Sequence, residues 1–192
     1  MTCIVAVTDG KRIVMGGDSA GVGGFSLTVR KDKKVFKRID ESQTTWLFGF
    51  TTSFRMGQLI QYELVLPQVN AKARADLYGF MVTKFIPSLR TCLKNGGYAG
   101  KKEEVERGGT FLVGLLGRIF EIEGDYQVGE PAELFYSVGC GHDLAKGSLC
   151  STKQIKDLRK RAHQALVAAE TFSSGVRGPF EFVESDCSKP SA

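Results

Sequence analysis

Two short apolar segments open the chain, and a turn separates them. Residues 4–7 are apolar and mostly β-branched, and residues 12–15 form a second apolar-rich segment. Between them, Asp9-Gly10 supplies the residue types that favour the positive φ angles of a tight reversal. Gly16-Gly17 then lets the backbone pass close to a neighbour before Asp18. The pattern predicts a β-hairpin over residues 1–18.

Other short segments rich in β-branched and aromatic residues predict further strands. They cover residues 27–39, 44–50, 110–116, 118–124, 134–138 and 180–183. We expect loops at the glycine-rich residues 20–26 and at the charged residues 98–108. Two hairpins within the first fifty or so residues favour antiparallel sheets.

Apolar residues at helical spacing predict four helices between these strands. They cover residues 54–69, 75–93, 144–149 and 151–172. The segment Thr51-Thr52-Ser53 can cap the first helix, and Ser151-Thr-Lys-Gln154 has the form of a capping box for the last. Pro67 and Pro87 should each end or kink the helix that contains them.

The order of the elements is strands, two helices, strands, two helices and one strand. Such an order matches an α+β fold in which helices cover both outer faces of stacked antiparallel sheets. The 192 residues suit a single domain, which we place at residues 1–184, and no linker or repeat divides them. We expect residues 185–192 to be a disordered tail.

Composition narrows the class of protein. The net charge is +5, but lysines and arginines are spread along the chain, which disfavours nucleic acid as a partner. The five cysteines are odd in number and form no C-x-x-C pair, so we expect no disulfide framework, metal site or cofactor. No signal peptide or long apolar run is evident, so we expect a soluble, cytoplasmic protein without a membrane partner.

Thr2 is the first candidate for chemistry. Its small side chain permits removal of Met1, which would leave a hydroxyl and a free α-amine on one residue. A hydroxyl is a poor nucleophile until a base takes its proton, and an α-amine with a pKa of about 7.7–8.0 can act as that base. The sequence thus offers a nucleophile with its own base attached, on condition that Met1 is removed.

Thr2, the hairpin closing with Gly16-Gly17-Asp18-Ser19, and Lys34 resemble proteasome-type N-terminal-nucleophile (Ntn) hydrolases. Bacterial proteasome-like peptidases, such as the peptidase subunit of the two-component heat-shock protease, are the closest resemblance. It implies a four-layer αββα sandwich, cleavage of peptide bonds in peptides or unfolded proteins, and a homo-oligomeric ring. It also implies an ATPase unfoldase, which must be a separate chain because this one lacks a G-x-x-x-x-G-K-[ST] motif.

The resemblance assigns a role to each candidate residue. Thr2 is the nucleophile, Lys34 lowers the pKa of its amine by charge repulsion, and Asp18 orients Lys34. Lys33 is the alternative to Lys34, because adjacent residues of a strand point to opposite faces. The backbone N–H groups near Thr51 or Thr52 would stabilise the oxyanion, although the family usually has glycine there.

Two positions depart from the family pattern. Cys140 lies in Gly139-Cys140-Gly141, where many members have serine close to the nucleophile. Ser174, with Ser173 as a close rival, matches a supporting serine, but Thr171 stands where the family has aspartate. These departures leave two alternatives open: a non-catalytic subunit of the same fold, and an amidase that acts on a small molecule through Thr2.

Overall fold

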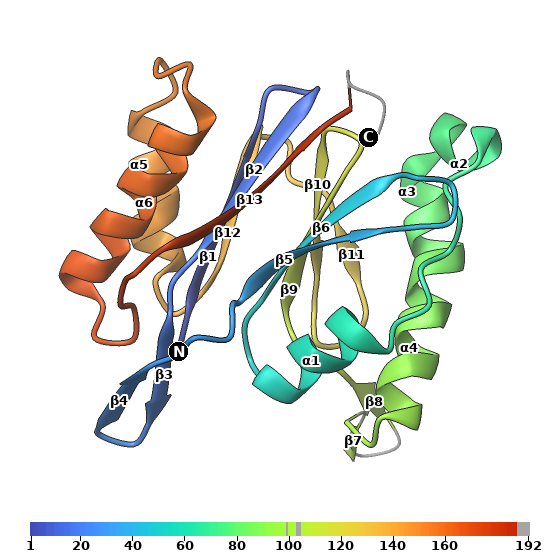
Figure 1. Ribbon diagram of the computed structural model, residues 1–192, viewed down its shortest axis with the longest axis horizontal. Helices are drawn as coiled ribbons and strands as arrows, with labels where there is room; N and C mark the ends of the chain where they lie inside the picture. The colour runs from blue at the N-terminus through green and yellow to red at the C-terminus, as the bar shows by residue number, and fades with distance from the viewer. Residues whose placement is uncertain (99, 103–104, 188–192) are drawn as a thin grey trace.

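The first of two antiparallel sheets gathers strands from the two ends of the chain. In this computed structural model, which describes residues 1–98, 100–102 and 105–187, its strand order is β12-β1-β2-β13. The predicted hairpin forms β1 and β2, and later strands flank it on both sides (Figure 1). The bounds are β1 Cys3–Thr8, β2 Arg12–Gly17, β12 Phe135–Gly139 and β13 Glu181–Asp186.

The second sheet comes from the middle of the chain and has the order β11-β10-β9-β6-β5. Its bounds are β5 Val35–Ile39, β6 Thr45–Phe50, β9 Phe111–Leu115, β10 Arg118–Ile122 and β11 Val128–Gly129. Two small hairpins lie outside both sheets: β3 Ala20–Gly23 with β4 Ser26–Val29, and β7 Gly100–Lys102 with β8 Val105–Arg107.

Helices cover the outer face of each sheet (Figure 1). The first sheet carries α5 His142–Ser151 and α6 Leu158–Phe172. The second carries α1 Phe54–Tyr62, α2 Ala71–Ala75, α3 Leu77–Phe80, the π-helix η1 Met81–Phe85 and α4 Ile86–Asn95. The predicted α+β class, with antiparallel sheets and helices, is therefore confirmed.

β1 is apolar at nearly every position because both of its faces are buried. Alternate side chains of a strand point to opposite faces. Ile4 and Ala6 pack with residues of the second sheet, whereas Cys3, Val5 and Val7 pack with residues of α5 and α6. The strand that follows Thr2 is thus held between a sheet and a helical layer.

The predicted helix boundaries are partly confirmed. α1 ends at Tyr62, well before Pro67, and Ser53 Oγ caps its start by accepting from the backbone N–H groups of Arg55 and Met56. The predicted helix over residues 75–93 is split, with a π-helical segment directly before the turn that holds Pro87. Proline has no N–H to give the preceding turn, and a wider turn accommodates the missing bond.

Four sequence predictions are corrected. Residues 20–26 were expected to be a loop but contribute to the β3–β4 hairpin, and part of 98–108 forms β7 and β8. Ser151 ends α5, and Asp157 caps α6 by accepting from the Lys160 N–H (3.0 Å), so the predicted capping box does not form. β13 continues to Asp186, so residues 185 and 186 are not tail, and residues 188–192 lie outside the described residues.

Asp40 fastens the loop after α1 to the second sheet. Its buried carboxylate accepts four hydrogen bonds: from Ser42 Oγ (2.6 Å), Thr44 N (2.9 Å), Trp46 Nε1 (3.1 Å) and Val69 N (3.2 Å). Burial alone would raise the pKa of Asp40, but these four hydrogen bonds hold it below its ordinary value of 3.8.

We expect Asp40→Asn to lower the free energy of unfolding by about 2 kcal/mol at pH 7. The side-chain NH2 group of asparagine would replace one carboxylate oxygen and would face hydrogen-bond donors of the protein instead of accepting from them. A carboxyl group with a lowered pKa stabilises the fold above its unfolded pKa, and this contribution is lost as pH falls through the folded pKa. Urea unfolding should therefore show the gap between wild type and variant narrowing below pH 3.8. Asp143→Asn, at a side chain that is 88% exposed, is the control and should change little.

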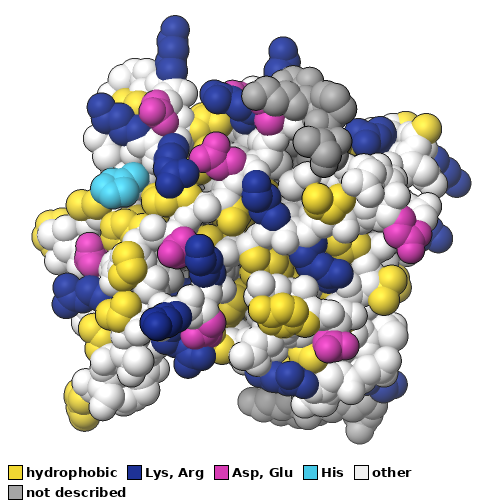
Figure 2. Space-filling view, viewed as in Figure 1, with side chains coloured by type: hydrophobic (Ala, Val, Ile, Leu, Met, Phe, Trp, Pro, Cys, Tyr) yellow, Lys and Arg dark blue, Asp and Glu magenta, His cyan; other side chains and the backbone are white. Residues whose placement is uncertain are grey.

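Charged side chains do not gather into one basic surface on the face shown in Figure 2. Lysines and arginines are scattered over it and interspersed with aspartates and glutamates. None of the helices in the described residues is long and apolar enough to cross a membrane.

Candidate active site

Thr2 lies directly before β1 and is only 4% exposed. Its carbonyl oxygen accepts from the Gly141 N–H (3.3 Å), in the turn between β12 and α5. Its hydroxyl donates to the carbonyl oxygen of Met1 and accepts from Lys34 Nζ at 3.0 Å. The side chain is therefore held by the Met1 carbonyl oxygen and by the ammonium group of Lys34, which lies directly before β5 in the second sheet.

Lys34 is the centre of the site. It comes directly before β5, is 1% exposed, and is tied to β6 by a hydrogen bond from the Phe50 N–H to its carbonyl oxygen (3.0 Å). Its Nζ lies 2.9 Å from Asp18 Oδ1, 3.0 Å from Thr2 Oγ1 and 3.5 Å from the Met1 carbonyl oxygen. Lys33 instead reaches outward to Glu181 (2.9 Å), so Lys34 is the lysine that meets Thr2.

Asp18 is held by the backbone as well as by Lys34. Its carboxylate accepts from the N–H groups of Cys3 (2.9 Å), Ala20 (2.9 Å) and Arg177 (3.4 Å). The first two bonds follow from the hairpin that the sequence predicts. The third comes from a residue 159 positions away, for which the sequence carries no local signal.

Burial shifts the pKa of two groups around Thr2. It lowers the pKa of the Lys34 ammonium, although the nearby Asp18 carboxylate opposes this shift. It raises the pKa of the Cys3 thiol to about 12, so Cys3 stays protonated and is a packed strand residue rather than a nucleophile.

The two sheets approach closely where the site is built. A Cβ added at Gly49 of β6 would lie 2.5 Å from Ile4 Cγ2 of β1, and one at Gly17 of β2 would lie 3.1 Å from Val35 Cγ1 of β5. The first distance is shorter than real Cβ atoms show and the second is shorter than most of them show, so side chains at these positions would push the sheets apart. The glycines thereby allow Lys34, next to β5, to reach Thr2 next to β1 and Asp18 next to β2.

The predicted oxyanion segment forms a tight turn after β6. Thr51 N donates to the Thr110 carbonyl oxygen (3.2 Å), and Ser53 N donates to the Thr51 carbonyl oxygen (2.7 Å). The Thr52 N–H has no acceptor among the described residues, and Thr52 has a φ of 65°. Thr52 therefore occupies the conformation that glycine favours, and its N–H is the better of the two candidates for the oxyanion donor.

Thr52 should carry backbone strain, because a β-branched residue in the left-handed region costs about 1–2 kcal/mol. We expect Thr52→Asn to raise the free energy of unfolding by about 1 kcal/mol, since asparagine tolerates this conformation. Its side-chain oxygen can also replace Thr52 Oγ1 as acceptor for the Thr110 N–H (3.1 Å). Thr52→Val keeps the branching and loses the hydroxyl, so urea unfolding should show it less stable than wild type.

Cys140 lies against Thr2, as the resemblance implies. The Thr2 N–H donates to Cys140 Sγ (3.3 Å), and Ser173 Oγ is 3.7 Å from the same sulfur. Ser174 is exposed and forms no hydrogen bond with the described residues, so Ser173 is the serine that the structure brings to this group. Thr171 is also exposed and donates to the Val167 carbonyl oxygen (2.8 Å) within α6.

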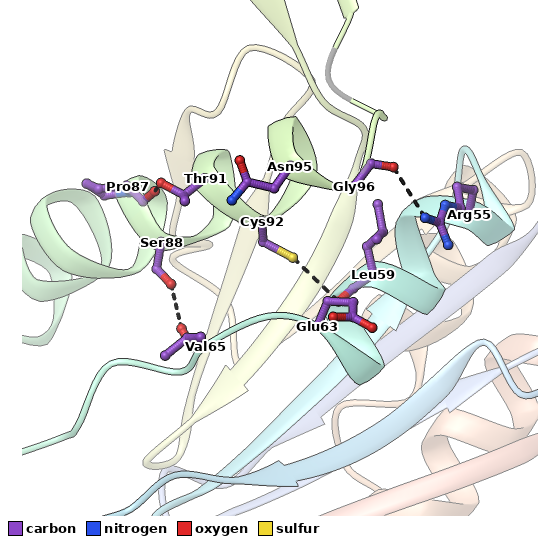
Figure 3. Close-up of a pocket in the computed structure, with 10 residues that line it drawn as sticks. All are labelled: Arg55, Leu59, Glu63, Val65, Pro87, Ser88, Thr91, Cys92, Asn95 and Gly96. Carbon is purple, nitrogen blue, oxygen red and sulfur yellow. Dashed lines mark hydrogen bonds between the residues drawn. The ribbon is translucent and has the colours of Figure 1, made fainter.

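A cavity of about 700 Å³ lies between α1 and α4 (Figure 3). None of the candidate residues lines it. Three of its side chains bond to backbone carbonyl oxygens: Arg55 Nη2 donates to that of Gly96, Cys92 Sγ to that of Leu59, and Ser88 Oγ to that of Val65. These bonds join the two helices, and no polar group of the cavity converges on Thr2.

Within the part of the chain that the structure describes, no group of three His, Cys, Asp or Glu side chains is placed to hold a metal ion.

Comparison with known proteins identifies the fold. No protein-family model and no curated protein sequence matches the chain, but many solved structures do. BPH from Thiobacillus denitrificans, in complex with Epoxomicin, is 17% identical, with a TM-score of 0.76 over 97% of this chain and 100% of that one. Eukaryotic HslV from Trypanosoma brucei is 17% identical, with a TM-score of 0.66 over 96% and 99%.

The Anbu complex from Pseudomonas aeruginosa, described as a helical assembly, is 16% identical, with a TM-score of 0.64 over 96% of this chain and 81% of that one. Each likeness extends over nearly the whole of this chain. At such low identity they show the fold alone, and that fold is the proteasome-type Ntn-hydrolase fold.

Proposed function

We propose that this chain, which has a proteasome-type Ntn-hydrolase fold, is a threonine-type peptidase with Thr2 as its nucleophile. The observation that carries the proposal is the position of Lys34 Nζ, which bridges Thr2 Oγ1 (3.0 Å) and Asp18 Oδ1 (2.9 Å) inside the protein. A buried ammonium beside a hydroxyl is costly to maintain, and it is useful where an adjacent amine must be kept neutral.

The proposed reaction starts once Met1 is removed. The free α-amine takes the proton of Thr2 Oγ1, and the oxygen attacks the carbonyl carbon of a peptide bond. The Thr52 N–H stabilises the oxyanion that forms. The amine returns the proton to the leaving nitrogen, which leaves an ester on Thr2 Oγ1. Water, activated by the same amine, then hydrolyses the ester and restores the hydroxyl.

We also propose a domain organisation and an oligomeric assembly for this chain. We infer one domain that extends to the end of β13, with the sheets and helices as an αββα sandwich. We also infer a homo-oligomeric ring in the cytoplasm that receives peptides or unfolded proteins from a separate ATPase unfoldase. Sedimentation velocity tests the ring, because a chain of 21.0 kDa that sediments as a monomer at micromolar concentration would contradict it.

Intact-mass spectrometry after exposure to a peptide epoxyketone such as Epoxomicin tests the catalytic proposal. This warhead reacts with a hydroxyl and a free amine on the same residue. We expect an adduct on a chain that lacks Met1, and none on Thr2→Ala. A chain that keeps Met1 and forms no adduct would support the non-catalytic alternative. A chain without Met1 that forms no adduct, and yet hydrolyses small amides, would support the amidase.

Alkylation of Cys140 should block this activity, because its exposed sulfur lies 3.3 Å from Thr2 N. We expect iodoacetamide to inactivate the wild-type protein and to spare Cys140→Ser, which keeps a hydrogen-bonding group at that position. Residual peptidase activity after timed alkylation is the measurement. Cys150→Ser is the matched control, since Cys150 is also an exposed free cysteine and its variant should remain sensitive.

A further inference from the structure

A polar cavity of about 380 Å³ adjoins the candidate active site. Thr51 and Thr52, the candidate oxyanion segment, line one side of it, and Gly139 lines another. Gly139 pairs with Cys3 across the sheet, and a Cβ at Gly139 would clash with the Thr2 carbonyl oxygen. Any peptide whose carbonyl group reaches Thr2 and Thr52 would therefore extend beside this cavity.

Two carboxylates dominate the charge of the cavity. Glu121 belongs to β10 and Glu123 follows it, and neither forms an ion pair with a described residue. Both act on Tyr136, whose pKa is raised to about 12 by burial, by its hydrogen bond with Glu121 and by the charges of the two glutamates. The two carboxylates thus converge on the same part of the wall.

One lysine also lines the cavity, so its carboxylates outnumber its ammonium groups by one. Lys146 Nζ lies 4.0 Å from the centroid of the Tyr136 ring, where it makes a cation–π contact. The imidazole Nδ1 of His142 bonds to the Gly139 carbonyl oxygen (2.6 Å), and its Nε2 lies 3.1 Å from Asp143. The cavity therefore keeps an acidic wall next to the site of reaction.

We propose that this cavity is a subsite for a cationic side chain of the substrate, lysine or arginine, close to the bond that is cleaved. Glu121 and Glu123 are its specificity-determining residues. An anionic side chain would be repelled by both carboxylates. An apolar one would fill the cavity without offering a hydrogen bond or an opposite charge to the two carboxylates. The inference rests on the proposed peptidase function.

The test compares cleavage of paired peptides that differ only in one residue near the cleaved bond: lysine, glutamine or glutamate. Cleavage sites are first mapped by mass spectrometry on a digest of an unfolded protein. We expect kcat/KM for the lysine peptide to exceed that for the glutamate peptide by about tenfold, which corresponds to about 1.4 kcal/mol. The preference should shrink in 0.5 M NaCl, because salt screens partly exposed charges.

In Glu121→Gln/Glu123→Gln the lysine-to-glutamate ratio should fall to within about twofold. Glu133→Gln/Glu184→Gln removes the same charge at exposed positions outside the cavity and should keep the wild-type ratio. An unchanged ratio in the cavity variant, or no preference for lysine in the wild type, would contradict the proposed subsite. Epoxyketone labelling would show in either case whether Thr2 is reactive. If the wild type is neither labelled nor able to cleave peptides, the peptidase itself is wrong, and the subsite falls with it.

Discussion

Replacing Lys34 with methionine is expected to remove peptidase activity and to lower the free energy of unfolding by about 3 kcal/mol. Lys34 Nζ contacts Asp18 Oδ1 and Thr2 Oγ1 in a region from which water is excluded. Without the ammonium, the Asp18 carboxylate remains buried beside an apolar side chain. The three hydrogen bonds that Asp18 accepts from backbone N–H groups still stabilise its charge. The expected loss of stability is therefore at the low end of the range for a buried ion pair that loses one partner.

Activity should fall by at least about a hundredfold in Lys34→Met, because the nearby positive charge would no longer keep the Thr2 amine neutral. Urea unfolding and turnover of an unfolded protein are the two measurements. The double variant Asp18→Asn/Lys34→Met removes both charges, so it should recover most of the lost stability and none of the activity. This separation distinguishes a catalytic role for Lys34 from a purely structural one.

Lys33→Met is the matched control, since it makes the same change one residue away. Lys33 has a side chain that is 58% exposed, and it pairs with Glu181 at the surface. Surface ion pairs contribute about 0–1 kcal/mol, so this variant should keep both stability and activity. Loss of activity in Lys33→Met, together with an active Lys34→Met, would contradict the assignment.

The sequence predicted the parts of the site that depend on local pattern. The apolar runs around Asp9-Gly10 were sufficient for the β1–β2 hairpin, and with it for Asp18 at its end. The expectation that Lys33 and Lys34 point to opposite sides is confirmed. Both were expected within a strand, however, and Lys34 precedes β5. Lys34 instead lies at a bend directly before the strand, and its side chain still turns inward while that of Lys33 reaches Glu181.

Other features depend on distant contacts that no local pattern reports. Arg177 reaches Asp18 only because the segment after α6 returns to the first sheet. The left-handed conformation of Thr52 runs against its residue type, so nothing in the sequence distinguished it from Thr51. The predicted capping box at Ser151 failed because its hydroxyl bonds back to the carbonyl oxygens of Gly147 and Ser148 in α5.

Replacing Thr2 with valine is expected to lower kcat/KM by at least about a thousandfold, whereas Thr2→Ser should stay within about tenfold of wild type. Valine keeps the shape of the side chain and the α-amine but has no hydroxyl to attack a carbonyl carbon. Serine keeps both the hydroxyl and the amine and loses one methyl group. Both residues are small enough to permit removal of Met1, so the intact mass of each variant reports whether its amine is free.

The stability of Thr2→Val and Thr2→Ser provides a second test. Thr2 Oγ1 accepts a hydrogen bond from Lys34 Nζ (3.0 Å), and valine cannot replace this acceptor. Thr2→Val should therefore also lower the free energy of unfolding by about 1–2 kcal/mol, whereas Thr2→Ser keeps the bond. A Thr2→Val protein without Met1 that still cleaved peptides would move the nucleophile elsewhere, with Cys140, 3.3 Å from Thr2 N, as the first candidate. Loss of cleavage with a folded chain and a free amine would leave the hydroxyl of Thr2 as the group that attacks the peptide bond.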